Sequence, residues 1–561
     1  MNRFSLSALL LLLIASSSCR ETKRPPEVDI VSTPAELNES ASENIQRTLS
    51  YASSNEGDIG DSTHLFAYDI VNSAYSKNEF IPFWSDSEQW LPLGDSLFQF
   101  IVESKLYGLF PEDYYGPKLS TIRDKISNDS MSRRNAALWA KADLLLTDAF
   151  LHIVKDLKVG RIPKDSISLR KDTVVNEDFY EQQLNILRKS NSVTKTLRPL
   201  EPRHQGYHLL KAGIKAFLDS AREGPSTRVP SSKEDSVNFR TLLQKRLVEA
   251  GYFSSDSIAA DSIALAAAVK KFQKDHKLTV DGKAGETTLR VLNQTDQERF
   301  MLIAITLDKF KMLPEKMPDK YLWVNIPSFY MTLKEKDSVK LVSKIICGKP
   351  ITRTPLLTSA ISEIITYPQW TVPSSIIEKE ILPAVKRDPG YLARKGFSLV
   401  DKDGNVIDPF TVEWTKYKKG IPYKVVQGSG DDNALGILKF NFPNKYAVYL
   451  HDTNQRSLFG RDMRSLSHGC VRVQEWEKLA LYIIRNDSKD TSVVRAVEDS
   501  MNAWLARKEK HSIPIRNKLP LYIRYHSAEA TPQGIRFYDD IYGEDKRIQA
   551  DWFTHKQGLG K

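Results

Sequence analysis

The chain has 561 residues, well beyond the size at which a single hydrophobic core stops growing, so several domains are expected. Hydrophobic residues make up 41% and charged residues 27%, which is ordinary for a globular protein. The formal net charge is +10, but no dense basic cluster with interleaved aromatic residues occurs, which argues against nucleic acid as a partner. A mildly basic surface suits a polyanionic matrix or an acidic substrate, and equally a solvated surface of mixed charge.

The N-terminal stretch has the order of a secretory signal. Asn2-Arg3 precedes the apolar run Leu6 to Ile14, and small residues then lead to Cys19. This pattern is typical of an exported protein, and the run is too short for a permanent membrane span. Cys19 stands where a lipobox has its lipidated cysteine, although Ser16 replaces the usual leucine. We predict a signal over residues 1–19 and a lipid anchor on Cys19, with ordinary signal-peptidase cleavage nearby as the alternative.

The small number of cysteines indicates a reactive thiol rather than a framework of disulfide bonds. If Cys19 carries a lipid, Cys347 and Cys470 remain, so at most one disulfide is possible. A free thiol in an oxidising compartment favours a chemical role for one of the two. Cys347 has no histidine beside it, and we expect it to be a small buried residue.

The first part of the chain is predicted to be a tether and then a helical scaffold domain. Residues 20–60 are rich in Ser, Asn and Glu with little apolar periodicity, which is typical of a flexible tether. Over residues 61–235 the apolar spacing is helical, and Leu144 to Leu157 is apolar on most of its circumference, which indicates a central buried helix. Gly160 and Pro163 end that helix. No catalytic spacing occurs in this region.

Residues 236–297 are predicted to form a small module. Apolar residues around 242–247 and 265–272 mark two helices, and Glu286 to Asn293 is expected to be a closing helix after a glycine turn. The stretch FQKDHKLTVDGKAGETTLRVLN resembles the three-helix peptidoglycan-binding-like domain of many wall enzymes. The resemblance implies that fold and leaves open whether the module binds glycan or acts as a spacer.

A β-rich domain is predicted from residue 298 onward. A helix over Glu298 to Met312, expected to be amphipathic, leads into strands and turns. The predicted strands are Tyr321–Ile326, Tyr330–Leu333, Leu341–Ile346, Ser362–Thr366 and Tyr446–Leu450. The irregular stretch 370–436, with one helix over Ser374 to Val385, is long enough to be a capping insertion. We place the catalytic domain at 298–510, strands packing on it at 511–548 (Leu521–Tyr525 and Ile535–Tyr538), and a tail at 549–561.

The segment His451 to Val473 holds two histidines and the tetrapeptide Ser467-His468-Gly469-Cys470. A cysteine attacks a carbonyl as its thiolate, and a nearby imidazole takes the thiol proton and later returns it to an amine. His451, at the end of a predicted strand, and His468, two residues from the thiol, are both candidate partners. Gly469 allows close backbone approach, and the amide of Cys470 is a candidate oxyanion donor.

This motif resembles the active site of the L,D-transpeptidases of peptidoglycan. The similarity extends to GILKFNFPNKYAVYLHDT (436–453), to CGKPITRTPLLTSAISEIITYPQWTVP (347–373) and to IYGED (541–545). These segments are similar to the large Gram-negative subfamily with an N-terminal scaffold and a substrate-capping insert. The implied fold class is multidomain α+β, with a helical scaffold, the three-helix module and a mostly-β catalytic domain.

The resemblance also implies roles for individual residues. Cys470 resembles the nucleophile and His451 the general base of the family. His468 and Gly469 occupy site-shaping or oxyanion positions. The implied substrate-binding residues are Arg472, Tyr449 and, as a lid-hinge or acceptor-wall residue, Trp370.

The implied reaction is 3→3 cross-linking of stem peptides through a Cys470 thioester, with release of D-Ala. Tetrapeptide stems serve as donor and acceptor, whereas water or another amine would give carboxypeptidase or protein-attachment activity. A catalytically idle wall-binding scaffold is the alternative from another class. The implied setting is the periplasm of a Gram-negative bacterium, with a membrane anchor and wall-synthesis enzymes as partners.

No metal or other cofactor is predicted. His451, Asp452, His468 and Cys470 are of zinc-ligand type, but thiolate chemistry needs no metal, and the S-H-G-C motif lacks a paired C-x-x-C. Asp452 is expected to be a turn or hydrogen-bonding residue rather than a member of a triad.

Overall fold

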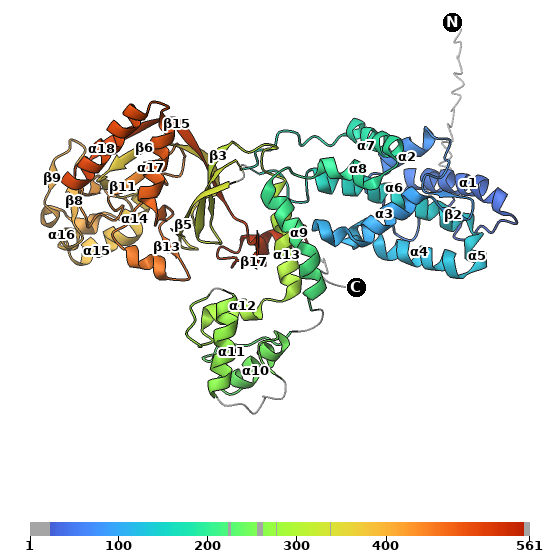
Figure 1. The fold of residues 1–561 in the computed structure, drawn as a ribbon, viewed down its shortest axis with the longest axis horizontal. Coiled ribbons are helices and arrows are strands. Elements are labelled where there is room, and N and C mark those ends of the chain that lie inside the picture. The colour runs from blue at the N-terminus through green and yellow to red at the C-terminus, as the bar shows by residue number, and fades with distance from the viewer. Residues whose placement is uncertain are drawn as a thin grey trace, which may run out of the picture. The chain divides into compact units, whose positions relative to one another are not determined.

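The computed structural model describes residues 23–165, 167–222, 226–254, 262–276, 278–336 and 338–554, which fold into two compact units (Figure 1). The first unit consists of residues up to 105, 109–158 and 173–201, and the second of residues 106–108, 159–172 and 202 onward. The predicted signal and Cys19 lie outside the described residues. None of the described helices has the length and apolar character needed to cross a bilayer.

The first unit is helical, as predicted, and is built around one buried helix. Its main helices are α1 (Pro34–Ser53), α2 (Tyr68–Ser76), α3 (Pro92–Val102), α4 (Gly116–Asn128), α6 (Ala136–Lys158) and α7 (Glu177–Ser190). Helix α6 is buried along nearly its whole length, which confirms the central helix predicted over Leu144–Leu157. Its buried Asp143 accepts hydrogen bonds from the backbone N–H groups of Phe83 (2.8 Å) and Trp84 (3.0 Å), because a buried carboxylate must be hydrogen-bonded.

The tether predicted over residues 20–60 is wrong for its second half. Residues Pro34–Ser53 form α1, whose buried positions include Leu37, Ala41, Ile45 and Leu49. These residues recur every four positions and form a narrow apolar stripe, which packs against α6. Because the other faces of this helix are polar, the overall composition of the segment did not indicate the apolar stripe.

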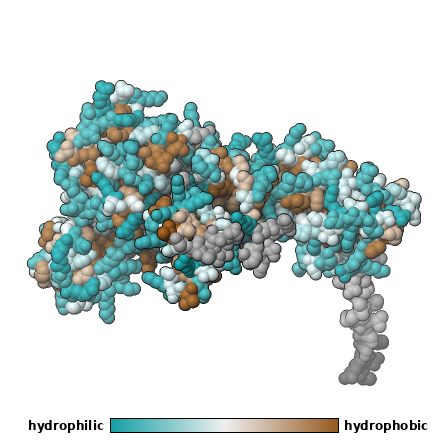
Figure 2. Space-filling view, turned by 60° about the horizontal axis from the view of Figure 1, so that its bottom comes forward, coloured by the Kyte–Doolittle hydropathy of each residue, from teal (hydrophilic) through white to brown (hydrophobic). Residues whose placement is uncertain are grey.

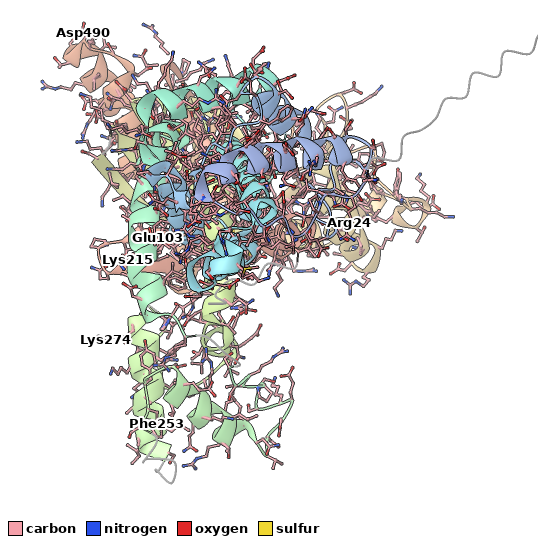
Figure 3. All side chains as sticks on the ribbon, turned by 90° about the vertical axis from the view of Figure 1, so that its right-hand side faces the viewer. Arg24, Glu103, Lys215, Phe253, Lys274 and Asp490 are labelled. Atoms are coloured by element: carbon pink, nitrogen blue, oxygen red, sulfur yellow. The ribbon has the colours of Figure 1, made fainter. Side chains whose placement is uncertain are left out.

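The three-helix module in the second unit is confirmed. Its helices are α10 (Phe239–Glu249), α11 (Ser262–Asp275) and α12 (Glu286–Asn293), around a core that includes Leu247 and Phe272. The side-chain amide of Gln273 donates to Asp281 Oδ1 (2.8 Å) and to the carbonyl of Lys283 (3.0 Å), which fixes the glycine turn before α12. Phe253 and Lys274, labelled in Figure 3, belong to this module.

Helix α13 (Asp296–Phe310) follows the module. It begins with a capping box in which Thr295 and Glu298 bond each other's backbone N–H groups. The amphipathic character predicted for this helix is wrong, because Phe300 to Phe310 is buried without interruption. Helix α9 (Gln205–Ser220) packs along α13 (Figure 1), and α13 also packs against α19 (Glu544–Trp552) and β16 (Ala528–Thr531), so it is covered on several sides.

A nine-stranded sheet forms the centre of the β-rich region, in the order β13-β5-β14-β12-β11-β6-β15-β3-β4. Its strands are β3 (Lys320–Asn325), β4 (Tyr330–Glu335), β5 (Ser338–Gly348), β6 (Leu357–Thr366), β11 (Leu438–Asn441), β12 (Leu450–His451), β13 (Ser465–Ser467), β14 (Val471–Val473) and β15 (His511–Arg524). Strand β5 pairs with β4 as well as with β14, so the sheet closes on itself. This fold confirms the mixed helical and β-rich class.

Two strand predictions need correction. The strand predicted over Tyr446–Leu450 is reduced to Leu450 at the start of β12, because Asn444 Oδ1 accepts from the backbone N–H of Tyr446 (3.0 Å) and Val448 (3.2 Å) and holds a turn there. The strand predicted near Leu521 does not pack onto a finished domain. It is part of β15, which lies inside the sheet between β6 and β3. The sheet therefore extends past the predicted limit of residue 510.

Two helices follow β14 and pack on the sheet, and a third helix is the last element in the described part of the chain. Helices α17 (Trp476–Asp487) and α18 (Thr491–Arg507) follow β14, and Asp490, labelled in Figure 3, caps α18 by accepting from the N–H of Ser492 (2.9 Å). The tail predicted from residue 549 is partly helical, because α19 continues to Trp552 and buries Ile548. Hydrophilic residues dominate the face drawn in Figure 2, as the composition predicts.

The insertion between β6 and β11 has a core of its own. A four-stranded sheet holds β7 (Trp370–Thr371), β10 (Lys424–Gln427), β8 (Phe397–Val400) and β9 (Val406–Ile407). The predicted helix over Ser374–Val385 forms as a helical stretch from Ser374 to Arg387 with a π-turn at Ile377–Ile381. Val385, Leu392 and Leu399 are fully buried among these elements. We refer to residues 370–427 as the cap.

Candidate active site

Strand pairing places His451 and Cys470 on the same face of the sheet. Strands β12 and β14 run parallel, with Leu450 opposite Val471 and His451 opposite Arg472. Leu450 and Val471 are buried in the core. Since side chains alternate along a strand, Tyr449, His451, Cys470 and Arg472 all point to the other face, which we call the site face. The predicted nucleophile and base therefore lie on neighbouring strands and point the same way.

The turn that presents Cys470 requires glycine. Gly469 has a φ of +122°, a conformation that residues with a side chain rarely adopt. Ser467 Oγ accepts from the Gly469 N–H (3.2 Å) and donates to the Cys470 carbonyl (2.6 Å), and Thr354 Oγ1 donates to the Gly469 carbonyl (2.8 Å). These bonds hold the turn from both sides.

The turn geometry distinguishes the two candidate oxyanion amides. The Gly469 N–H is engaged with Ser467, whereas the Cys470 N–H meets no acceptor in the described part of the chain. A backbone amide that remains open beside the thiol is the kind of donor that an oxyanion requires. The arrangement therefore favours Cys470 over Gly469 as the donor.

Burial favours the neutral forms of both Cys470 and His451. Burial raises the pKa of the Cys470 thiol to about 11, against the opposing effects of Tyr449, Lys439 and Arg472. Burial, followed by the charge of Arg472, lowers the pKa of His451 to about 3. At neutral pH the pair is a thiol and an uncharged imidazole, so the proton must move as attack occurs.

The backbone of Asp452 and of Leu435 hydrogen-bonds the imidazole of His451, whereas the carboxylate of Asp452 does not orient it. His451 is buried, and its Nδ1 has no hydrogen-bond partner among the described residues. Asp452 instead accepts from Arg456 (2.7 and 3.2 Å) and from the backbone N–H of Ile437 (3.1 Å). These bonds agree with the expected turn role of Asp452, and they leave an imidazole nitrogen open to a proton from the thiol.

Arg472 and Lys439 flank the base. Lys439 on β11 is the register partner of His451 on one side, and Arg472 on β14 is its partner on the other. Arg472 Nη1 donates to Thr453 Oγ1 and Gln455 Oε1 (3.3 Å each), and its buried Nε has no partner among the described residues. Lys439 was missed in the sequence, although the alternation Leu438-Lys439-Phe440 would have indicated a polar side chain opposite two core residues.

Tyr449 connects the site face to the cap. The ring centroids of Tyr449 and His451 lie 6.0 Å apart, and the Tyr449 hydroxyl interacts with the Cys470 thiol and with Trp370. Trp370 is at the start of the cap and lies against Phe397, with ring centroids 6.1 Å apart. Thus the predicted residues Tyr449 and Trp370 are brought to the thiol, one directly and one through the tyrosine.

His468 contacts the cap. Its side chain is partly exposed, and its Nε2 lies 2.5 Å from Glu380 Oε1, in the π-turn of the cap. Glu380 was not indicated by the sequence, because the pairing depends on how residues 370–427 fold over the turn. The two histidines of the motif therefore have different surroundings.

The other cysteine in the described part of the chain is buried. Cys347 on β5 is fully buried, as predicted, and burial raises the pKa of its thiol to about 12. It and Cys470 are both free thiols. Among the described residues, no group of three or more His, Cys, Asp or Glu side chains is arranged to hold a metal ion.

Three family models match separate parts of the chain. A "Scaffold domain" model matches residues 69–213, a "Putative peptidoglycan binding domain" model residues 236–292, and an "L,D-transpeptidase catalytic domain" model residues 319–493. The last match contains the sheet strands β3 to β14, the cap and the turn at Gly469.

Two known proteins are similar to parts of this chain. A "Putative L,D-transpeptidase" of Haemophilus influenzae is 35% identical over 260 residues, 46% of this chain and 51% of the relative, so the chain spans about half the length of that protein. The solved "Structure of the Ldtfm-avibactam carbamoyl enzyme" is 14% identical, covering 41% of this chain and 63% of that chain, with a TM-score of 0.18. Residues 319–493 are thus similar to L,D-transpeptidase catalytic domains, and residues 69–213 and 236–292 are similar to scaffold and peptidoglycan-binding domains.

Proposed function

We propose that this protein is a peptidoglycan L,D-transpeptidase that forms 3→3 cross-links between stem peptides through a thioester on Cys470. The observation that carries the proposal is the shared site face of His451 and Cys470, with an open amide beside the thiol. An idle wall-binding scaffold would not need a turn of positive φ at glycine that presents a thiol to a buried imidazole whose Nδ1 has no partner among the described residues.

In the first step, His451 takes the proton of the Cys470 thiol as sulfur attacks the carbonyl of the diaminopimelyl residue in a donor tetrapeptide. The new C–S bond forms as the C–N bond to the terminal D-Ala breaks, and the proton passes from His451 to the departing amine. The Cys470 N–H stabilises the oxyanion of the tetrahedral intermediate. D-Ala leaves and a thioester remains.

In the second step, the side-chain amine of an acceptor stem attacks the thioester. His451 accepts the amine proton and returns it to the departing Cys470 sulfur, so the enzyme is regenerated and a new amide bond is formed. Water as acceptor would give carboxypeptidase activity. The cap, which contacts the motif through Glu380 and His468, is suited to limit water at this stage.

We also propose that the protein acts in the periplasm of a Gram-negative bacterium, anchored through a lipid on Cys19, near enzymes that supply stem peptides. Its substrates are assigned from the peptidoglycan-binding and L,D-transpeptidase catalytic regions. Metabolic labelling with a radioactive fatty acid tests the anchor, and a Cys19→Ala variant that retains the label would exclude it.

The central test incubates the protein with disaccharide-tetrapeptide and follows cross-linked dimer and free D-Ala by mass spectrometry. Cys470→Ala should abolish both products. His451→Ala should also lose acylation by a carbapenem, whereas His468→Ser should keep much of it. If Cys470→Ala formed as much dimer as the wild type, or if the ranking of the two histidines were reversed, the assignment would be wrong.

A further inference from the structure

Lys439 points into the site from the strand beside the base. On β11 its neighbours Leu438 and Phe440 are fully buried, so Lys439 projects to the site face. It is the register partner of His451, and its Nζ lies 3.8 Å from the centre of the Tyr449 ring. The ammonium is thus held over the tyrosine that contacts the Cys470 thiol.

This ammonium has no anionic or hydrogen-bonding partner in the described part of the chain. No carboxylate lies within ion-pair distance of Lys439, and no acceptor contacts its Nζ. Glu363 shares its face of the sheet, but its oxygens accept from Asn441 Nδ2 and Ser512 Oγ, both at 2.5 Å. Burial lowers the pKa of Lys439, and Lys510 adds to this, while Cys470 and Glu363 oppose it.

Burying an ammonium group whose three N–H donors lack acceptors costs free energy, and this cost is offset when an anion binds there. The ring of Tyr449 holds the ammonium in place without neutralising it. Arg472, on the opposite flank, differs because two of its neighbours, Thr453 and Gln455, already accept from it. Lys439 is therefore the less satisfied of the two cations.

The positions of Cys470 and Lys439 suit a substrate whose anionic group lies one residue away from the attacked carbonyl. Cys470 lies across from Tyr449, and Lys439 lies across from His451 on the far side of β12, so two interstrand spacings of about 4.8 Å separate the nucleophile's strand from that of the lysine. The flexible four-carbon stem of lysine extends over Tyr449 toward the thiol. A terminal carboxylate lies one peptide residue, about 3.8 Å, beyond the attacked carbonyl, and the lysine side chain that extends over Tyr449 is placed to meet it.

We propose that Lys439 binds the terminal carboxylate of the donor peptide, the carboxylate of the residue that leaves when Cys470 is acylated. The inference rests on the proposed function and deepens it, because it makes a free terminal carboxylate a requirement for the donor. The rival role, stabilisation of the Cys470 thiolate by the same charge, predicts different behaviour and is separated by the experiment.

The experiment compares two donors that differ only at their end: disaccharide-tetrapeptide with a free terminal carboxylate, and the same peptide with a terminal amide. kcat/KM for release of the terminal residue is measured for wild type, Lys439→Met and Lys439→Arg. The control is Lys445→Met, since Lys445 is exposed and lies over Tyr446 at 5.3 Å, the same kind of contact outside the site.

Lys439→Met should lower kcat/KM about 10- to 100-fold for the carboxylate donor and hardly at all for the amide, because a charge-assisted hydrogen bond is lost only with the former. Lys439→Arg should retain most of the wild-type preference for the carboxylate donor over the amide donor, and Lys445→Met should retain all of that preference. The rate of Cys470 alkylation by neutral iodoacetamide should stay within about twofold in Lys439→Met. Equal losses with both donors, together with slower alkylation, would overturn the inference in favour of thiolate stabilisation.

A binding measurement separates failure of the inference from failure of the proposed function. Isothermal titration calorimetry on Cys470→Ala and on Cys470→Ala with Lys439→Met uses the same two peptides and needs no turnover. Tighter binding of the carboxylate peptide that disappears with Lys439→Met supports the inference even if the wild type releases no D-Ala, in which case only the proposed function fails. Equal binding of the two peptides to Cys470→Ala overturns the inference, even if turnover is normal.

Discussion

His451 lies directly opposite Arg472 in the parallel pairing of β12 and β14, so a guanidinium stands beside the imidazole on the site face. After burial, the charge of Arg472 is the largest cause that lowers the pKa of His451 to about 3. The shift favours an unprotonated His451 at physiological pH, and burial favours the thiol form of the neighbouring Cys470. Both pKa shifts favour a neutral thiol and imidazole over a thiolate–imidazolium ion pair before substrate binds.

A neutral Cys470 thiol and His451 imidazole predict an acylation rate that varies little with pH. Because burial lowers the pKa of His451 to about 3 and raises that of Cys470 to about 11, the second-order rate of carbapenem acylation should change little between about pH 5 and 9. Arg472→Gln removes a cation that disfavours imidazolium, so the pKa of His451 should rise and the acid limb should move to higher pH. Acylation followed by intact-protein mass spectrometry measures both. Arg461→Gln, on an exposed residue of the preceding loop, is the control. A bell-shaped wild-type profile with an acid limb near pH 6.5 would contradict the neutral pair.

Gly469→Ala tests the turn that presents the thiol. A Cβ there would meet nothing closer than 3.5 Å, so space is available and only the φ of +122° opposes it. Holding alanine in this region costs on the order of 1–3 kcal/mol, or else the turn changes shape. We expect a lower urea midpoint and at least tenfold slower carbapenem acylation. Gly460→Ala, where a Cβ meets open space and φ is not positive, should behave as wild type. An unchanged acylation rate in Gly469→Ala would show that the turn geometry is dispensable.

The contact between His468 and Glu380 should hold the cap in place. Glu380→Gln weakens the pair by removing the carboxylate charge, so backbone amides of the helical stretch from Ser374 to Arg387 should exchange with deuterium faster. Hydrogen exchange with mass spectrometry measures this, and Glu378→Gln in the same turn is a control of the same type. His468→Ser should accelerate exchange to the same extent. Unaltered exchange in both variants would mean that the cap is held by other contacts.

A buried ion pair supports the end of the second unit. Lys309 on α13 donates to Asp545 Oδ1 (2.7 Å) and to the carbonyl of Tyr525 (2.8 Å), and both side chains are nearly inaccessible. Burial opposes the charge of Lys309, but Asp545 and Glu544 outweigh it and raise its pKa. Removing one partner of such a pair costs about 3–5 kcal/mol. Asp545→Asn should therefore lower the urea midpoint strongly.

The control for this pair is Asp219→Asn, which removes the exposed partner of Lys215, a residue labelled in Figure 3. Surface pairs of this kind contribute little, so the unfolding transition should not move. Comparable shifts for Asp545→Asn and Asp219→Asn would argue that the Lys309 pair is not a significant part of the core.

The amino-acid sequence by itself determined what depends on local pattern and motif. The helical spacing of Leu144–Leu157, the three helices of the module and the strands near Tyr321 follow from the local pattern of apolar residues, which reflects contacts between near neighbours. The S-H-G-C motif indicated Cys470 as the proposed nucleophile and two histidines as candidates for the base. The sequence did not reveal α1, because its apolar stripe is one residue in four within a polar segment.

The tertiary structure alone decided which residues meet. The inclusion of β15 between β6 and β3, the parallel pairing of β12 with β14, and the contact of Glu380 with His468 join residues from about 20 to 200 positions apart. Lys439 gained its place beside His451 in the same way, through the register of β11 and β12. Such pairings depend on burial summed over the whole sheet and on the closure of the chain between strands, and no local spacing records them.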